Sequence, residues 1–267
     1  MSHRLRAHEL DLPLRQTTVT DMLQMLDDPD VDIRNVGQRI ATEPVLAARL
    51  LTLANSPFYG RRDAVLDLPA AVMTVGQTSV RALVLALAVD AILSDDLGLA
   101  PDWWDDCLHI GAIAASLAPA TRADSGTAFC AGLLADIGHL AIAVSAPDAW
   151  AALSATTNEA DPPDVATVLA AETDRFGIDH PSLGARILED LGLPATLTMA
   201  VARHHDPEAR ADGGINHAVF AAAELIVAYK ADDDLTPTLI DNGIEIEESE
   251  LRDQVCDQVG TLRAAFS

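Results

Sequence analysis

The sequence predicts an all-α protein. Hydrophobic residues make up 49% of the chain but aromatic residues only 4%, and the abundant alanine and leucine favour helices. No long alternation of Val, Ile, Thr or Tyr predicts a strand. Apolar residues recur instead at helical spacing, as do Leu133, Leu134, Ile137 and Leu140. With 267 residues, the chain has room for one large or two modest domains.

Residues typical of helix starts and helix ends predict where the helices of the first half lie. Thr42 and Pro44 predict the start of one helix, and Asn55 predicts its end. Asp67 predicts the cap of the next, and Gly76 its end. The polar stretch SDDLGLAPDWWDD then marks the clearest boundary in the chain. The helices expected before this boundary are 20–26, 32–41, 42–55, 67–76 and 78–93.

Proline residues predict where several helices of the second half begin. Pro101, Pro147, Pro162 and Pro194 each stand where a helix is expected to begin. The first of these helices carries His109, and the last ends at the segment RHHDP. Further helices are expected over 127–145, 181–191 and 215–230, followed by a final amphipathic helix in EESELRDQVCDQVGTLRAAF.

Charge and composition exclude several classes of protein. The formal net charge of −24 disfavours nucleic-acid binding, because phosphates would be repelled. The apolar stretches 82–93 and 128–144 are interrupted by charged residues and fall short of the ~20 residues of a membrane span. The first residues lack the apolar core of a signal peptide, and three cysteines do not suggest a disulfide framework. We therefore expect a cytoplasmic protein. Its acidity fits either salt adaptation or a GC-rich genome.

Asp136 interrupts an apolar stretch, GLLADIGH, and needs a partner if it is buried. Helix bundles build metal sites from inward-facing His and carboxylate side chains of several helices. Imidazole and carboxylate ligands suit Zn, Fe, Mn or Ni. Spacing alone also fits surface histidines or an Asp136 that only accepts hydrogen bonds. The candidates for such a site are His109, Asp136, His139, His180, His204, His205 and Glu224.

Two groups of motifs resemble the HDOD domain, an all-helical relative of the HD metal-dependent phosphohydrolases. The first group is DPDVDIRNVGQRIATEPVLAARLLTLANSPFYG and LDLPAAVMTVGQTSVRALVLALAV; the second is FCAGLLADIGHLAI and DHPSLGARILEDLGLPATLTMAVARHHDP. The resemblance covers about residues 15–230. It implies a helical bundle with an N-terminal lobe over 1–98, an HD-like lobe over 99–230 and a C-terminal helical extension over 231–267.

The resemblance also implies a partly eroded metal site. Catalytic HD proteins carry an HDIGK-like segment, which here reads Ala135-Asp136-Ile137-Gly138-His139. Ala135 has no ligand atom, and His139 stands where some relatives have a phosphate-contacting lysine. His109, His180 and the pair His204 and His205 match other histidines of the family, as candidate residual ligands. Glu224 matches the final aspartate only loosely.

We therefore expect a non-catalytic bacterial signalling or regulatory module that acts through contacts with a separate protein chain. In this interpretation Asp136 pairs with His109 or with a downstream histidine. We expect no cofactor unless the residual site binds Zn, Fe or Mn, and neither nucleic acid nor membrane as a partner; a nucleotide ligand stays open. The alternative is a metal-dependent phosphohydrolase or cyclic-nucleotide phosphodiesterase that uses the remaining His and Asp ligands.

Overall fold

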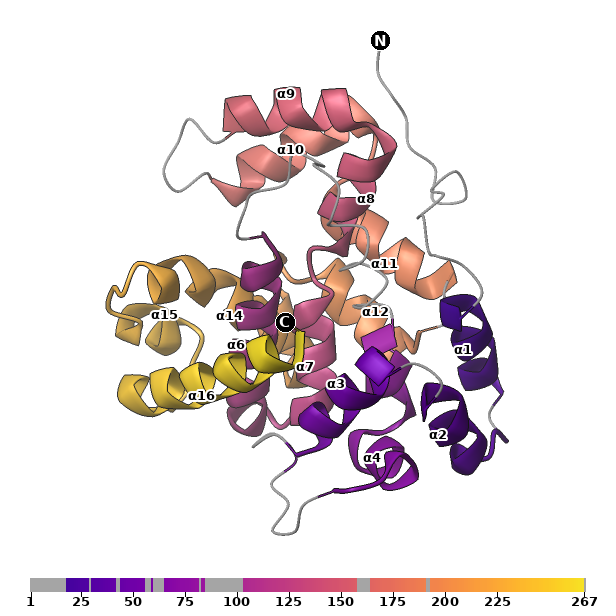
Figure 1. The fold of residues 1–267 in the computed structure, drawn as a ribbon. Helices are drawn as coiled ribbons and strands as arrows, with labels where there is room; N and C mark the ends of the chain where they lie inside the picture. Colours follow the sequence, from indigo (N-terminus) through magenta and orange to yellow (C-terminus); the bar gives the residue numbers. More distant parts are fainter. Residues whose placement is uncertain are drawn as a thin grey trace.

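The computed structural model describes residues 18–28, 30–41, 44–55, 59, 65–81, 83–84, 103–157, 164–190 and 193–266. Within these residues the protein consists of helices joined by turns, with no strand, which confirms the predicted all-α class (Figure 1). Residues 85–93 of the helix predicted over 78–93 lie outside the described residues.

Four short helices form the N-terminal part. The cap predicted for the fourth is confirmed, because Asp67 Oδ1 accepts a 2.8 Å hydrogen bond from the amide of Ala70. Gly76 ends this helix at φ 83°, a left-handed conformation that glycine adopts without strain. Residues 77–81 and 83–84 are helical again. The four helices are α1 (Thr18–Asp27), α2 (Ile33–Ala41), α3 (Pro44–Ala54) and α4 (Leu68–Val75).

A longer series of helices forms the second part, around the almost wholly buried helix α6 (Trp103–Thr121). Helices α7 (Ser125–Leu133) and α14 (Gly214–Lys230) pack along it. The other helices of this part are α8 (Ile137–Ser145), α9 (Pro147–Thr157), α10 (Val165–Phe176), α11 (His180–Asp190), α12 (Ala195–Ala202) and α13 (Ala209–Asp212).

The C-terminal segment joins the two parts. After α15 (Thr236–Asp241), helix α16 (Glu248–Phe266) packs against both α6 and α3, and it runs across the front of the molecule in Figure 1. The side chains of Gln258 and Ser116 meet at 3.4 Å in this interface. One hydrophobic core extends from Met22 of α1 to Val259 of α16. The predicted final helix is thus confirmed, and it is an integral part of the core.

The apolar stretch around Asp136 differs from the expected single helix over 127–145. A turn over 134–136 separates α7 from α8 and places Asp136 at the N-terminal cap of α8. Asp136 makes no side-chain hydrogen bond to the start of α8, so its carboxylate is left for other partners. The segment Ser125–Ser145 is long and apolar enough to cross a membrane by length and composition, but 78% of its apolar window is buried inside the protein. Burial of this kind is typical of the core of a soluble protein.

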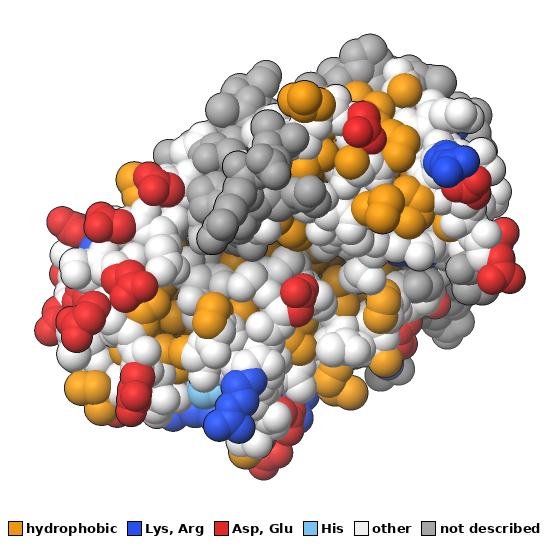
Figure 2. Space-filling model, turned by 90° about the horizontal axis from the view of Figure 1, so that it is seen from below, with side chains coloured by type: hydrophobic (Ala, Val, Ile, Leu, Met, Phe, Trp, Pro, Cys, Tyr) orange, Lys and Arg blue, Asp and Glu red, His pale blue; other side chains and the backbone are white. Residues whose placement is uncertain are grey.

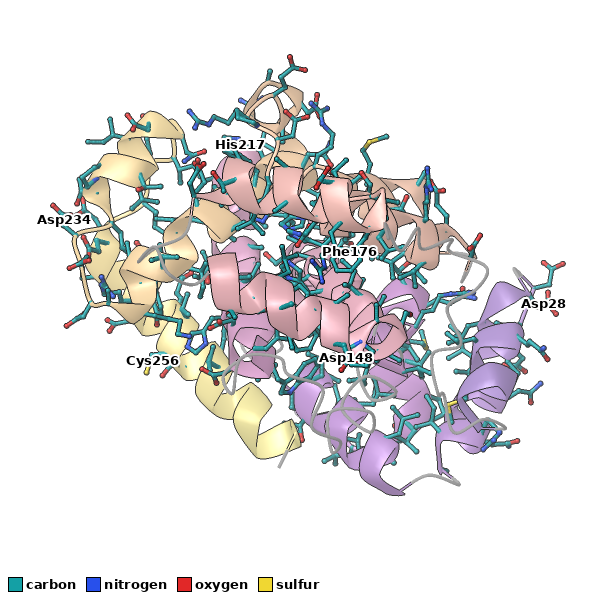
Figure 3. The ribbon with its side chains drawn as sticks, turned by 90° about the horizontal axis from the view of Figure 1, so that it is seen from above. Asp28, Asp148, Phe176, His217, Asp234 and Cys256 are labelled. Carbon is teal, nitrogen blue, oxygen red and sulfur yellow. The ribbon has the colours of Figure 1, made fainter. Side chains whose placement is uncertain are left out.

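Helices α9 and α10 form a hairpin that lies on top of the second part (Figure 1). They do not join the main core but a smaller hydrophobic cluster, which they share with α8 and α11. It includes Phe176, the last residue of α10, whose side chain is completely buried and which Figure 3 labels at the hairpin, seen from above. The hairpin therefore rests on its own small core directly above α8 and α11.

Candidate metal centre

Six polar side chains meet beneath the α9–α10 hairpin. They come from segments far apart in the sequence: the turn before α8, the first turns of α8 and α11, the middle of α10 and the turn that follows α12. The six residues are Asp136, His139, Glu172, His180, His204 and His205. Five of them were predicted from the sequence, whereas Glu172 was not.

Two glycines bring α8 and α11 close enough to form the cluster. A Cβ atom on Gly138 would lie 2.1 Å from the carbonyl oxygen of His180, so no other residue fits there without moving the backbone. Gly184 packs against Gly138 and Ile137 in the same interface. Because Gly138 lies two residues after Asp136, this close approach sets Asp136 beside His180.

Three acceptor atoms form a nearly equilateral triangle at the centre of the cluster. Asp136 Oδ1 lies 3.4 Å from His180 Nε2 and 3.4 Å from His204 Nε2. The two Nε2 atoms lie 3.3 Å apart. The side chains of His180 and His204 are almost inaccessible to solvent, whereas that of Asp136 is 16% exposed. We call these three atoms the acceptor triangle.

The hydrogen bonds of the two histidines fix which ring nitrogen carries the proton. His204 Nδ1 lies 2.7 Å from the carbonyl oxygen of Val201, which can only accept, so Nδ1 donates. His180 Nδ1 likewise lies 2.8 Å from Glu172 Oε2. In the neutral rings both Nε2 atoms are then unprotonated and direct lone pairs toward the Asp136 carboxylate. Such an arrangement is unfavourable unless a cation lies between the three atoms.

The pKa values favour neutral rings at His180 and His205. Burial and the nearby charge of His139 lower the pKa of His180 to about 4, although Glu172 opposes this shift. Burial and the neighbouring His204 and His180 lower the pKa of His205 to about 2. Burial alone would raise the pKa of Asp136, but the neighbouring His204, His139 and His180 hold it well below its usual range. At neutral pH the Asp136 carboxylate is therefore ionised beside the neutral ring of His180, and metal ions bind ligands in these states.

Glu172 organises the other half of the cluster. Its side chain is completely buried; Oε1 accepts a 2.9 Å hydrogen bond from His139 Nε2, and Oε2 accepts 2.8 Å hydrogen bonds from the Nδ1 and the backbone amide of His180. Burial alone would lower the pKa of His139, but Glu172 and Asp136 raise it above its usual value. His139 thus lies between two carboxylates that favour its protonated form. We call His139, Glu172 and His180 the hydrogen-bonded triad.

The sequence contained a signal for Glu172 that the motif-based interpretation missed. In α10 it continues the helical stripe formed by Val168, Leu169 and Phe176, which faces the protein interior. A carboxylate in such a stripe needs partners for the same reason that Asp136 does. The criterion that singled out Asp136 therefore also applies to Glu172.

The residues of the acceptor triangle fit a bound transition metal. Tetrahedral zinc with bonds of about 2.0–2.1 Å has its ligand atoms about 3.3–3.4 Å apart, which is the spacing of the triangle. Imidazole and carboxylate donors suit Zn, Fe and Mn. His180 and His204 also have the carboxylate and carbonyl partners that orient metal-binding histidines. His205, whose ring centroid lies 4.0 Å from that of His204, is within reach as a fourth ligand.

The end of α12 explains how the adjacent His204 and His205 both reach the cluster. The helix stops at Ala202, and residues 203–205 form a turn, so the two rings are no longer constrained to helical directions. His204 is completely buried, whereas His205 is partly exposed.

Two predicted site residues lie elsewhere. His109 Nδ1 lies 2.8 Å from the backbone oxygen and 3.2 Å from the carboxylate of Asp105, and its ring lies beside that of Tyr229. Asp136 lies against the downstream His180 and His204, as one of its two expected pairings has it, whereas His109 lies against Asp105. Glu224 accepts hydrogen bonds from Arg210 and Asn242, which lie outside the cluster.

The direction of α6 explains the error at His109. Burial and the negative charge of Asp136 raise the pKa of the Cys107 thiol well above its usual value, so the side of α6 near the cluster carries Cys107. His109 lies two residues further along, about 200° around the helix. Matching motif letters could not reveal this rotation.

The chain belongs to the HDOD domain family, whose family model matches residues 12–207. A relative with no assigned function in Treponema pallidum (strain Nichols) is 23% identical over 199 residues, which are 73% of this chain and 38% of that protein. The chain thus spans less than half of this curated relative.

The fold is similar to that of solved proteins. A crystal structure from Shewanella amazonensis SB2B, described as a candidate phosphohydrolase, superposes with a TM-score of 0.71 at 22% identity and covers 97% of both chains. A candidate signal transduction protein of Marinobacter aquaeolei VT8 superposes with a TM-score of 0.64 at 20% identity, over 99% of this chain and 62% of that one. At such identities the likeness establishes the fold.

Proposed function

We propose that the chain is a signalling module of the HDOD family that binds one transition-metal ion and acts through protein contacts. The observation that carries this proposal is the acceptor triangle: a carboxylate oxygen and two imidazole nitrogens, buried and spaced 3.3–3.4 Å apart, which is the spacing of ligands around a shared cation. In this proposal Asp136, His180 and His204 hold the ion, and His205 is available as a fourth ligand. Bound metal would link the turn before α8, the start of α11 and the end of α12.

Two features support a regulatory rather than a hydrolytic role. Ala135 offers no ligand atom for a second metal, so a complete dinuclear centre lacks one of its donors. Phosphate substrates also need cations, and two that the structure describes are engaged. Arg203, beside His204, is bound to Asp206 and Asp212, and the single lysine, Lys230, is paired with Asp106.

The acidic surface supports a protein partner. Figure 2 shows one face on which acidic side chains are widespread, basic ones are few and hydrophobic ones lie between them. With a net charge of −24, such a surface repels nucleic-acid phosphates but accepts a basic protein surface. A signalling role also agrees with the name of the structurally similar protein from Marinobacter aquaeolei. We place the module in the cytoplasm, as expected from its sequence.

A metal-dependent phosphohydrolase is the second candidate. It is favoured by the partial exposure of Asp136 and His205, which leaves one side of the triangle open to water. A metal ion there would lower the pKa of a bound water and supply a nucleophile at neutral pH. The name of the similar protein from Shewanella amazonensis points to the same activity.

Metal analysis combined with a phosphodiesterase assay tests the proposal. The protein is purified without a histidine tag, its Zn, Fe and Mn are quantified, and hydrolysis of bis(4-nitrophenyl) phosphate is measured with each metal. We expect one equivalent of metal and no hydrolysis above that of Asp136→Asn. Hydrolysis that disappears in Asp136→Asn would favour the second candidate. Protein that neither contains nor takes up metal would contradict both.

A further inference from the structure

The α9–α10 hairpin contacts the metal centre from above at two points. Trp150 of α9 places its ring 5.2 Å from that of His139, and Glu172 of α10 binds both His139 and His180. The rings of His139 and His180 are in contact, with centroids 3.7 Å apart and planes tilted by 31°. The hairpin thus holds His139 between Trp150 and His180, and it fixes His180 from the side opposite the acceptor triangle.

Glu172 acts on the ring of His180 in a way that a neutral acceptor cannot. Its carboxylate accepts the Nδ1 proton and so keeps Nε2 free to bind metal, while its charge makes that nitrogen a stronger donor. The backbone amide of His180 binds the same carboxylate oxygen, so the main chain and the ring are aligned together. His204 has only the neutral carbonyl of Val201 in the equivalent position.

The hairpin that carries Glu172 is attached to the protein through its own small core. Phe176 and Leu153 pack there with Ile142 of α8 and Ile187 of α11, separately from the main core. Elements with a small separate core open at lower free energy than those in the main core. A movement of this hairpin would withdraw Glu172 from His180 without unfolding the rest of the domain.

We propose that Glu172 is a positioning residue for the metal centre, and that through it the α9–α10 hairpin sets the affinity of the site for a divalent transition metal. This inference rests on the proposed metal binding and adds a route for its regulation. Coupling between two parts of a protein is reciprocal. Metal binding at the triangle therefore stabilises the hairpin, and a protein partner that displaces the hairpin weakens metal binding.

Calorimetric titration with Zn²⁺ compares the parent with three variants. Glu172→Gln keeps the size of the side chain but removes its charge, and we expect one equivalent of zinc bound about 10–100-fold more weakly. Asp174→Asn removes an exposed carboxylate from the same helix and should leave the affinity unchanged. Asp136→Asn removes a ligand and should weaken binding by more than about 100-fold.

Hydrogen exchange provides a readout that a purely structural role would not change. In the parent, Zn²⁺ should slow amide exchange in α9 and α10 as well as at the triangle. In Glu172→Gln, saturating Zn²⁺ should protect the triangle but leave the hairpin unprotected. If this variant binds zinc as tightly as the parent, or if its hairpin gains equal protection, the inference is wrong while the proposed metal binding stands. If the parent binds no zinc, both are wrong.

Discussion

The two halves of the histidine cluster share His180 but differ in spacing. In the hydrogen-bonded triad the side-chain atoms lie 2.8–2.9 Å apart, the length of hydrogen bonds with a proton between each pair. In the acceptor triangle they lie 3.3–3.4 Å apart, and the neutral rings have no proton directed at the centre. Buried polar residues in one cluster can thus have different tasks. The triad is satisfied by its own protons, whereas the triangle needs a cation from outside.

Removing the carboxylate of the triangle should have the largest effect. Asp136→Asn should weaken zinc binding by more than about 100-fold, because loss of a ligand exceeds loss of a residue that merely orients one. Without metal, the amide of the variant can donate to an imidazole lone pair, so its melting temperature should equal or exceed that of the parent. Zinc titration and thermal melts measure both effects. Asp148→Asn, at an exposed position on α9, is the control. A variant with parental zinc affinity would show that the triangle is not the metal site.

The close approach of α8 and α11 provides the next test, because both halves of the cluster depend on it. Gly138→Ala should lower the free energy of unfolding by about 3 kcal/mol, since the new Cβ collides with the backbone of His180. Gly260→Ala is the matched control: no atom lies within 4 Å of its added Cβ, and alanine should stabilise α16 by about 0.5–1 kcal/mol. Urea unfolding measures both. Equal effects of the two substitutions would contradict the tight contact at His180.

The adjacent histidines sharpen the comparison further. His204→Gln should weaken zinc binding about tenfold more than His205→Gln, because His204 is oriented by the carbonyl of Val201 and its Nε2 belongs to the triangle. Zinc titration of the two variants, at equal helix content, gives the ratio. If His205→Gln lost more zinc affinity than His204→Gln, the third ligand would be His205 and not His204.

The smallest expected effects concern helix caps. Asp164 caps α10, the helix that carries Glu172, through the amide and hydroxyl of Thr167. Replacing Asp164 by Ala should cost about 1 kcal/mol of stability, and Asp67→Ala at the cap of α4 should cost about the same. Only the first should also weaken zinc binding, by a few-fold at most. Equal zinc affinities in the two variants would show that fraying of α10 does not reach the triad.

Local chemistry made much of the helix pattern predictable. Asp67 and Gly76 mark the start and the end of α4 as expected, because a helix cap and a glycine at positive φ depend only on residues within one turn. The predicted helix over 215–230 and the final helix correspond to α14 and α16. At 134–136 the apolar residues keep their helical spacing, but the helix stops and the chain turns. Hydrophobic periodicity indicates which residues are buried and does not show where the chain changes direction.

For the candidate site, the sequence by itself determined which chemistry was available: histidines and a carboxylate in apolar helices, with Ala135 in place of one donor. Only the tertiary structure decided which of them meet. It brought in Glu172 and left out His109 and Glu224, because the rotation of each helix about its axis depends on packing against distant segments. It also set the distances that separate a metal site from a hydrogen-bonded network. The distances in the acceptor triangle and in the hydrogen-bonded triad differ by about half an ångström. Such a difference depends on close packing between distant segments, such as that of Gly138 against His180, and no local sequence pattern encodes it.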